Sequence, residues 1–498
     1  MISKKLKYVL IFMFGALFLA PTLLQAKGDK KDGKTTLKKT TAQTASTLLD
    51  INNISTWFYN TGESDITPDG NSGFVFPKGS GKAAVFTAGL LWGARVDGDP
   101  DPRVGGTAYR TGLVQGNVDA NGNPPADNTT NERYRIYRIR PDVYPGGPAV
   151  DLSPDAANEG TTEAALRAAY EKDWTEWPAD MGAPFDDKDS SGTYNAGDVP
   201  GVPGSDQTIW FVANDLDPGQ TVFLYGANPL GLEVSETVWA YNRTGALGNM
   251  YFRKYTFKNV TNRSALTPTI FKDMYATMWA DIDLGEAGDD FIGVDTVLSL
   301  QYSYNANAVD ATYTPLPPPA VGFDFFQGPL VDGVSGEDKN KNTVDDASDF
   351  GIFNGVVVGP GKINLPMTAA FYFANGDPNI GDPPQGTVDG SRQFYNFFQG
   401  KFGKSGATFT DLDTGQPTTF ALNGDPQTGK GWLDGIQLPP GDRRNGSSSG
   451  PFNMGPGDVQ EVVVAEIVGG AIPGTDRLSA IGILKFFDVA AQNAYDNF

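Results

Sequence analysis

The sequence of 498 residues contains no cysteine and no histidine. Without cysteine there is no disulfide framework, so the stability of the chain must come from burial of a core and from any bound metal. Without histidine there is no Ser–His or Cys–His nucleophile, no histidine zinc site and no imidazole acid–base group. Any catalysis would therefore depend on carboxylates, lysine, tyrosine or a metal-bound water.

Positive charge is also scarce, and much of it lies near the N-terminus. The chain has 38 Lys and Arg against 59 Asp and Glu, a formal net charge of −21. Residues 1–26 contain three lysines and no acid, and residues 27–50 contain six lysines against three aspartates, so residues 51–498 carry about −27. An acidic field of this size repels nucleic acid and anionic membrane surfaces and attracts divalent cations. We therefore expect no nucleic-acid partner.

Long apolar runs are limited to one segment, residues 9–24, which contains Pro21. It is shorter than the roughly 20 residues that a membrane-spanning helix needs. Three lysines precede this run and the small residue Ala26 follows it, which is the layout of a secretory signal peptide. We predict a signal peptide over 1–26, a Lys-rich flexible linker over 27–50, and an exported protein with no membrane insertion after cleavage. The alternative is an uncleaved signal anchor.

Short aromatic and β-branched runs, separated by turns rich in Gly, Pro and Asp, cover much of the remaining chain. Six such runs with short connections are typical of a sandwich or a large curved sheet. They are residues 207–215, 220–229, 232–244, 249–261, 268–284 and 291–305. The predicted fold class is mainly β, an antiparallel β-sandwich or large curved sheets with long loops and a few short helices.

Two β-rich regions follow from this pattern, residues 51–305 and residues 306–498, and together they could form one domain. The first region carries an insertion at 116–206, which contains a helix expected over 161–177 and a calcium-type loop.

Two further helices are expected in the second region. One is short and covers residues 391–402. The other is amphipathic, begins at Thr475 or Asp476, and continues to the end of the chain. Its apolar stripe consists of Leu478, Ile481, Leu484, Phe487, Ala491 and Ala494. Because the sequence stops on this helix, we expect that the natural polypeptide continues beyond Phe498 or that this is a clipped form.

The stretch DKDSSGTYNAGD at 187–198 has the spacing of a calcium loop. Calcium prefers six to eight oxygen ligands, and a twelve-residue loop can supply them from alternate positions, with a glycine at the sixth. Gly192 holds that sixth position, and Tyr194 is expected to pack into the neighbouring core. The predicted ligands are Asp187, Asp189, Ser191, the carbonyl of Thr193, Asn195 and Asp198. The alternative is a surface turn that binds no ion.

A second stretch, DKNKNTVDDASD at 338–349, repeats the spacing more weakly. Thr343 stands where the glycine is expected, and two lysines dilute the negative charge. The candidate ligands are Asp338, Asn340, Asn342 and Asp349. The alternative is a solvated loop with Asx turns.

A third acidic group surrounds the end of the run at 268–284. Alternate residues of a strand share one face, and the following turn can fold back toward them. The candidate ligands are Asp281, Asp283, Asp289 and Asp290. A charged sheet rim and a pair of sugar-cleaving carboxylates are the alternatives. Three aromatic runs, at 57–59, 210–211 and 394–395, could stack on sugar rings but are expected to lie mostly in the core.

Several of these segments resemble the N-terminal region of large exported proteins of Gram-negative bacteria that use type IX secretion. The resemblance covers most of residues 51–498, and it is carried by NISTWFYNTGESD, DWTEWPADMGAPFDDKDSSG, MWADIDLGEAGDDFIGVDT and GDRRNGSSSGPFNMGPGDVQEVVVAEI. It implies a calcium-type loop of the form Asp-x-Asn-Gly-x-Gly at Asp187, from which this chain departs at Ser190 and Ser191. That family places a sorting domain after this region, and none follows Phe498 in this sequence. The resemblance implies an extracellular or cell-surface location, or the periplasm if the natural chain has no sorting domain.

The sequence therefore predicts an exported, calcium-stabilised, β-rich module with a structural, adhesive or binding role. Ca²⁺ is the expected cofactor, and the expected partner is a polysaccharide or another surface protein. The alternative function is a carbohydrate-active enzyme or sugar-binding domain that uses the acidic group at 281–290.

Overall fold

The computed structural model describes residues 45–333, 351–359 and 361–495. The predicted signal peptide, most of the predicted linker and the weaker loop of Asp338, Asn340, Asn342 and Asp349 lie outside the described residues. Among the described helices, none combines the length and the hydropathy that a membrane span requires.

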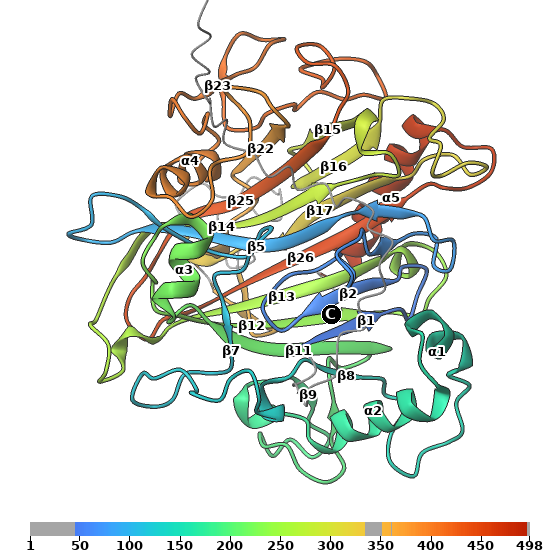
Figure 1. The fold of residues 1–498 in the computed structure, drawn as a ribbon, viewed down its shortest axis with the longest axis vertical. Helices are drawn as coiled ribbons and strands as arrows, with labels where there is room; N and C mark the ends of the chain where they lie inside the picture. Colours follow the sequence, from blue (N-terminus) through green and yellow to red (C-terminus); the bar gives the residue numbers. More distant parts are fainter. Residues whose placement is uncertain (1–44, 334–350, 360, 496–498) are drawn as a thin grey trace, which may run out of the picture. The chain divides into compact units, whose positions relative to one another are not determined.

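Two large antiparallel sheets dominate the described residues (Figure 1). The larger sheet runs in the order β15 (Asp290–Asp295), β16 (Leu300–Asn305), β17 (Ala320–Gln327), β26 (Val459–Gly469), β13 (Met250–Asn259), β12 (Leu232–Ala240), β11 (Gln207–Asn214) and β7 (Val114–Gln115), and β8 (Tyr137–Ile139) also pairs with β11. The smaller sheet runs in the order β22 (Ala369–Ala374), β25 (Arg443–Met454), β14 (Phe271–Ile282), β5 (Thr87–Arg95) and β6 (Arg103–Gly106). The prediction of a mainly β, antiparallel fold is confirmed.

Short two-stranded sheets complete the β structure. They are β1 (Ser46–Leu49) with β2 (Thr56–Tyr59), β3 (Phe74–Val75) with β4 (Ala83–Val85), β9 (Phe185–Asp186) with β10 (Val199–Pro200), β18 (Leu330–Asp332) with β21 (Lys362–Asn364), β19 (Gly351–Phe353) with β20 (Val356–Val358), and β23 (Phe409–Thr410) with β24 (Pro417–Thr418).

The main core lies between the two large sheets. It is built from alternate residues of both, because successive side chains of a strand point to opposite faces. Trp92 of β5, for example, meets Phe257 of β13 edge to face, with 5.7 Å between ring centroids. This face-to-face packing explains the period-2 apolar pattern of the sequence.

The two β-rich regions of the sequence share both sheets. Strand β26 lies between β13 and β17, and β25 lies between β14 and β22. The strands at 443–454 and 459–469 each pair on one side with a strand of the first region and on the other side with a strand of the second, so neither large sheet is built by one region alone.

Helices cover the outer faces of the sandwich. The five α-helices of the described residues are α1 (Ser153–Glu159), α2 (Glu163–Thr175), α3 (Pro218–Tyr225), α4 (Val388–Phe398) and α5 (Arg477–Tyr495). Aromatic residues of α4 pack on the outer face of the smaller sheet, and α5 packs on the outer face of the larger one. The predicted helices at 161–177, 391–402 and the C-terminus correspond to α2, α4 and α5.

The prediction of a strand over 220–229 is wrong, because residues 218–225 form helix α3. The β-branched and aromatic run TVFLY suggested a strand, but the flanking residues stabilise a helix. Asp217 caps the N-terminus by accepting hydrogen bonds from the backbone of Gly219 and Gln220. Pro218 fits the first turn, and Gly226 ends the helix in the left-handed conformation.

Most of the aromatic residues considered as sugar platforms lie in the core. Phe58, Trp210, Phe211, Phe394 and Tyr395 are buried, while Trp57 and Tyr59 are half-buried. Rings enclosed in this way present little face on which a sugar could stack, so these runs serve chiefly as core.

Charged side chains also lie inside the sandwich. Arg253 of β13 is fully buried, and its Nε donates a hydrogen bond of 2.9 Å to Glu236 of β12. The Tyr251 hydroxyl lies between two carboxyl groups, 3.1 Å from Asp65 Oδ1 and also within hydrogen-bond distance of Glu466 of β26. Burial raises the pKa of all three of these carboxyl groups. Polar residues thus connect neighbouring strands within an otherwise apolar core.

Candidate metal centre

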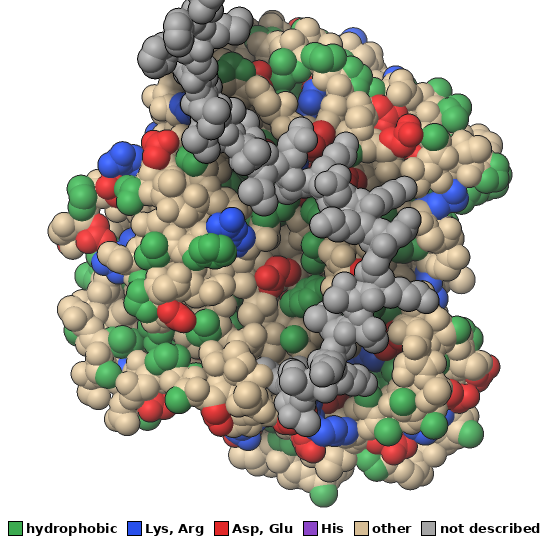
Figure 2. Space-filling model, in the orientation of Figure 1, with side chains coloured by type: hydrophobic (Ala, Val, Ile, Leu, Met, Phe, Trp, Pro, Cys, Tyr) green, Lys and Arg blue, Asp and Glu red, His purple; other side chains and the backbone are tan. Residues whose placement is uncertain are grey.

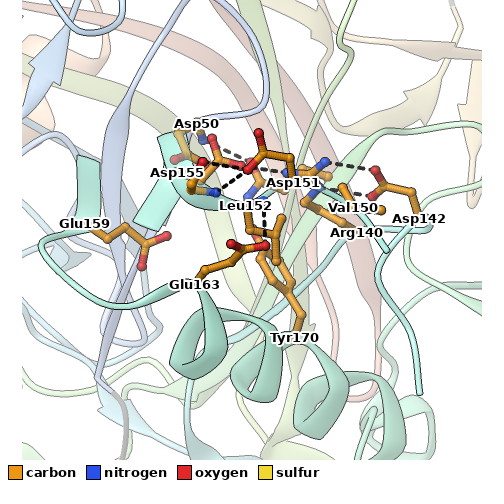
Figure 3. A network of polar contacts seen from close by, with 12 residues as sticks. Asp50, Arg140, Asp142, Val150, Asp151, Leu152, Asp155, Glu159, Glu163 and Tyr170 are labelled. Carbon is orange, nitrogen blue, oxygen red and sulfur yellow. Dashed lines mark hydrogen bonds and ion pairs between the residues drawn. The ribbon is translucent and has the colours of Figure 1, made fainter. Parts of the chain in front are cut away.

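Within the insertion at 116–206, buried ion pairs join helix α1 to strand β8, which pairs with β11 of the larger sheet. Arg140, directly after β8, donates to Asp155 of α1 at 2.6 Å and to Asp142 at 3.0 Å (Figure 3). Arg138 of β8 binds Glu159, at the end of α1, with 2.6 Å between Nη1 and Oε1. These contacts anchor the helices of the insertion that carries the predicted calcium loop.

The predicted calcium loop forms the tip of a short hairpin. Strands β9 and β10 pair Asp186 with Val199 and Phe185 with Pro200, and the intervening residues are the predicted loop. Tyr194 turns back from the loop and packs edge-on against Phe185, with ring centroids 5.3 Å apart. The hairpin and this aromatic contact hold both ends of the loop together.

Three carboxylates converge inside the loop. One oxygen from each of Asp187, Asp189 and Asp198 lies within 4.8 Å of the other two. Backbone groups of the loop orient them, since Gly192 N donates to Asp187 at 2.7 Å and Asn195 N donates to Asp198 at 2.8 Å. These bonds fix the carboxylates near one another despite their mutual repulsion.

The amide of Asn195 lies among the other predicted ligands. Its Nδ2 donates to Ser191 Oγ at 2.9 Å, to Thr193 O at 3.1 Å and to Asp189 Oδ2 at 3.2 Å. A single donor therefore contacts three of the predicted ligand residues. Rotation of this amide by 180° would present its oxygen instead, which would make every predicted ligand of the loop an oxygen.

Basic side chains stay outside this cage. Lys188 pairs with Asp186, which is not a predicted ligand. Among the described residues, no lysine or arginine forms an ion pair with Asp187, Asp189 or Asp198. Hydrogen bonds from Ser191 and Asn195 lower the pKa of Asp189, so this carboxyl group is ionised at neutral pH.

The acidic group at 281–290 has a different composition from the predicted one. Asp281 and Asp283 converge with Asp442, one oxygen of each lying within 4.8 Å of the others. The antiparallel pairing of β14 with β25 places Asp281 opposite Arg444, and Asp442 directly precedes β25. We call Asp281, Asp283 and Asp442 the sheet-end cluster.

Asp289 and Asp290 make other contacts. Asp289 accepts hydrogen bonds from Asn305 at 3.0 Å and from Asn307 at 2.9 Å. Asp290 is fully buried, and its Oδ2 accepts a long hydrogen bond of 3.4 Å from Leu284 N. Asp289 thereby ties the turn between β14 and β15 to the end of β16.

A guanidinium lies within the sheet-end cluster. Arg444 Nε is 3.1 Å from Asp281 Oδ1, and Arg444 Nη1 is 2.8 Å from Asp442 Oδ1. The Tyr109 hydroxyl donates to Asp281 Oδ2 at 2.8 Å. Burial, opposed by Arg444, raises the pKa of Asp281 to about 8, and burial also raises the pKa of the neighbouring Asp382.

Asp442, Arg444 and Tyr109 were not among the residues that the sequence singled out. The only local signal was the GDRR stretch at 441–444, where an acid lies beside two arginines. Their contact with Asp281 depends on pairing between strands that are far apart in the chain. By contrast, every predicted ligand of the first loop lies within twelve consecutive residues.

Charge is dispersed over the one face of the molecule that Figure 2 shows. On the face shown in Figure 2, acidic and basic side chains lie mostly singly among uncharged ones rather than in one patch. Within the part of the chain that the structure describes, the two aspartate groups are those in which three carboxylate oxygens converge within 4.8 Å.

Comparison with known proteins gives no family for this chain. No protein-family model matches it, and no curated protein is significantly similar to it.

Proposed function

We propose that this chain is an exported, calcium-stabilised β-sandwich module of the cell surface or extracellular space, with a structural, adhesive or binding role. The observation that carries the proposal is the oxygen cage at 187–198, in which three carboxylates converge without a basic side chain. The signal-like N-terminus supports export. The resemblance to type IX secretion proteins supports placement at the cell surface, with a polysaccharide or another surface protein as partner.

Calcium suits this cage better than other common protein metals. The predicted ligands are carboxylate, hydroxyl, amide and carbonyl oxygens, which calcium prefers and which thiophilic metals do not. The chain has no cysteine or histidine with which to compete for zinc or copper. A calcium ion would neutralise the three carboxylates and hold the hairpin tip in one conformation.

Binding to the folded state alone would stabilise the protein. At a hundredfold excess of calcium over its dissociation constant, the gain is about 2.7 kcal/mol. Such a gain is a large part of the net stability of an ordinary domain, about 5–15 kcal/mol. For an exported chain without disulfides, bound calcium would thus replace one usual source of stability.

Thermal unfolding of residues 27–498 tests the proposal. We expect millimolar calcium to raise the midpoint relative to excess chelator, and magnesium to raise it much less. Asp189→Asn should abolish the calcium-dependent rise. Asp119→Asn is the matched control, because Asp119 also accepts several backbone hydrogen bonds in an exposed loop, where it lies outside both aspartate groups. An equal calcium effect in the wild type and Asp189→Asn would contradict the proposal.

One observation favours the alternative of a carbohydrate-active enzyme. Asp281 has a pKa of about 8, so it is protonated at neutral pH, as a general acid must be. The two carboxylates of a glycosidase are usually separated by about 5–10 Å, however, whereas those of the sheet-end cluster converge within 4.8 Å. Assay of Asp281→Asn and the wild type on a panel of polysaccharides tests this alternative, which requires activity that the substitution removes.

A further inference from the structure

An aromatic cavity opens beside β22, at the edge of the smaller sheet, in the part of the molecule that holds β22, β23 and α4 (Figure 1). Its volume is about 230 Å³. The apolar part of its lining belongs to the aromatic cluster that packs α4 on this sheet, and consists of Tyr372, Ile380, Phe402, Phe409, Trp432 and Leu438. The polar part consists of Asp377, Asn379 and Gln437. Among the described residues that line the cavity, none is basic.

The aromatic rings of this cavity hold one another in place. Phe409 meets Phe402 edge to face with 4.8 Å between ring centroids, and its ring centroid lies 6.4 Å from that of Trp432. The backbone of Trp432 is fixed as well, because its carbonyl accepts a hydrogen bond of 2.9 Å from Gly424 N. The rings therefore form a preformed apolar wall, and a ligand that packs on it need not order these side chains.

Trp432 also brings a hydrogen-bond donor without a partner to the cavity. The residue is 3 % exposed, and its buried Nε1 has no acceptor among the described residues. A buried donor without an acceptor is unfavourable, and a ligand oxygen in the cavity would satisfy it. Trp92 has an unpartnered Nε1 too, but the cavity that it lines has a volume of only about 10 Å³, which suits one water.

The polar side chains lie toward solvent and leave hydrogen-bonding capacity for a ligand. Asn379 and Gln437 are exposed, and Asp377 is half-buried. Asp377 Oδ1 accepts from Asn379 N at 2.7 Å and from Ile380 N at 3.0 Å, which fixes this loop. Within the described residues, Asp377 Oδ2 and the two side-chain amides form no hydrogen bond. The carboxylate can thus accept from a ligand, and each amide can both donate and accept.

A neutral sugar ring matches this combination of surfaces. The C–H groups on a face of the ring are apolar and pack well on aromatic side chains. Its hydroxyl groups donate and accept, as the carboxylate, the amides and the indole Nε1–H require. A lining that contains a carboxylate and no basic residue disfavours an acidic sugar. Because pockets for drug-sized ligands measure about 300–1,000 Å³, this smaller cavity suits one ring.

We propose that the cavity lined by Trp432, Asp377 and Gln437 binds a single neutral sugar residue of a polysaccharide. The inference rests on the binding role proposed above for its choice of a polysaccharide as partner. It does not rest on calcium, because no residue of the loop at 187–198 lines the cavity.

Saturation-transfer NMR on the full chain, with calcium present throughout, tests the inference. The probes are the methyl glycosides of glucose, galactose, mannose and N-acetylglucosamine, with methyl glucuronide as the acidic counterpart. At least one neutral glycoside should receive saturation, most strongly at the ring C–H protons that face the aromatic side chains. The acidic glycoside should receive little. Titration of the neutral glycoside that binds then gives its dissociation constant.

Trp432→Phe removes the indole N–H but keeps an aromatic ring, so it should weaken binding roughly two- to tenfold, as expected for the loss of one hydrogen bond. Its control is Trp92→Phe, which also removes a buried, unpartnered N–H and should leave the affinity unchanged. Gln437→Ala should weaken binding by a similar factor, and its exposed position makes it the variant that folds if Trp432→Phe does not. Gln416→Ala is its control, an exposed glutamine that does not line the cavity.

The inference is overturned if no neutral glycoside binds, if the acidic one binds as tightly, or if the cavity variants bind like their controls. Asp189→Asn separates this inference from the proposed role of calcium, because it should remove the calcium-dependent rise in the unfolding midpoint and still bind the sugar. Sugar binding in a chain that calcium does not stabilise would contradict only the calcium proposal. Stabilisation by calcium in a chain that binds no neutral glycoside would overturn only the sugar site.

Discussion

Two groups of three aspartates each bring carboxylate oxygens within 4.8 Å of one another, yet the two groups differ in the side chain that lies among the acids. In the loop at 187–198, the side chain that lies among the carboxylates is the neutral amide of Asn195. In the sheet-end cluster of Asp281, Asp283 and Asp442 it is the guanidinium of Arg444. The loop therefore has no charged partner among the described residues, whereas the cluster already contains a cation.

This difference decides which group is the better calcium site. Under the proposed function, a calcium ion would take the place of the hydrogen bonds that the Asn195 amide donates, once that amide turned its oxygen toward the ion. In the sheet-end cluster it would have to displace Arg444 and leave a largely buried guanidinium without its partners, which costs several kcal/mol. Close approach of acids alone does not indicate a metal site, because the charge already present among them determines whether a metal is needed.

Removal of Arg444 is the strongest test of the comparison. Arg444→Met leaves the carboxylates of the sheet-end cluster without their cation, so the free energy of unfolding in chelator should fall by about 3–5 kcal/mol. Calcium should now restore part of this loss, because the cluster lacks a counter-charge. Urea unfolding with chelator and with calcium measures both effects.

Arg392→Met provides the control for that experiment. Arg392 pairs with Asp101 on the surface, where its side chain is 55 % exposed, so its loss should change the stability little and be insensitive to calcium. If Arg444→Met is as stable as this control, Arg444 is not the counter-charge of the cluster.

The pH dependence of stability should separate the two groups further. The pKa of Asp281 is raised to about 8, so the folded chain retains a proton that the unfolded chain loses above about pH 4. As the pH rises from about 4 to about 8, the Asp281 carboxyl group alone should lower the free energy of unfolding by up to about 1.4 kcal/mol per pH unit. In chelator, Asp281→Asn should remove this contribution, which urea unfolding at about pH 5 and about pH 8 would reveal as a shallower dependence.

Asp189 should behave in the opposite sense. Its pKa is lowered by hydrogen bonds, so its contribution is present at neutral pH and is lost on acidification through its folded pKa. Asp189→Asn should therefore leave the slope between about pH 5 and about pH 8 unchanged in chelator. A change of slope in this variant rather than in Asp281→Asn would reverse the assignment of charge states.

Local and non-local features differed in how well the sequence predicted them. The fold class followed from apolar alternation, and the ligand spacing of the loop is contained in twelve residues. Arg444 could not be foreseen, because its contact with Asp281 depends on the pairing of β14 with β25, which no short stretch encodes. The β-branched and aromatic residues at 220–229 predicted a strand where helix α3 forms. The helix depends on its capping residues Asp217 and Gly226, which lie outside the apolar run TVFLY.

In the C-terminal helix α5, too, the helix sequence alone does not determine which residues are buried. Its apolar stripe predicted Phe487 on the buried face, and the structure leaves Phe487 half-buried while it encloses Asp488. A small rotation of the helix decides between these neighbours. That rotation depends on the surface of the larger sheet against which α5 packs, which cannot be read from the helix sequence.

The smallest expected effect concerns the glycine at the sixth position of the loop. Gly192 has a φ of 73°, a left-handed conformation that costs L-residues about 1 kcal/mol or more, and no atom lies within 4 Å of where its Cβ would be. Gly146, with a φ of 75° and equally open surroundings, is its match in another turn. Alanine at either position should cost about 1 kcal/mol in chelator, because the backbone strain is the same.

With calcium, only Gly192→Ala should lose additional stability, since distortion of the loop moves the Asp187 carboxylate that Gly192 N orients. Calorimetric titration with calcium would show the same distinction as a weaker dissociation constant for Gly192→Ala and an unchanged one for Gly146→Ala. Equal calcium affinities in the two variants would mean that the loop does not wrap the ion as its spacing predicts.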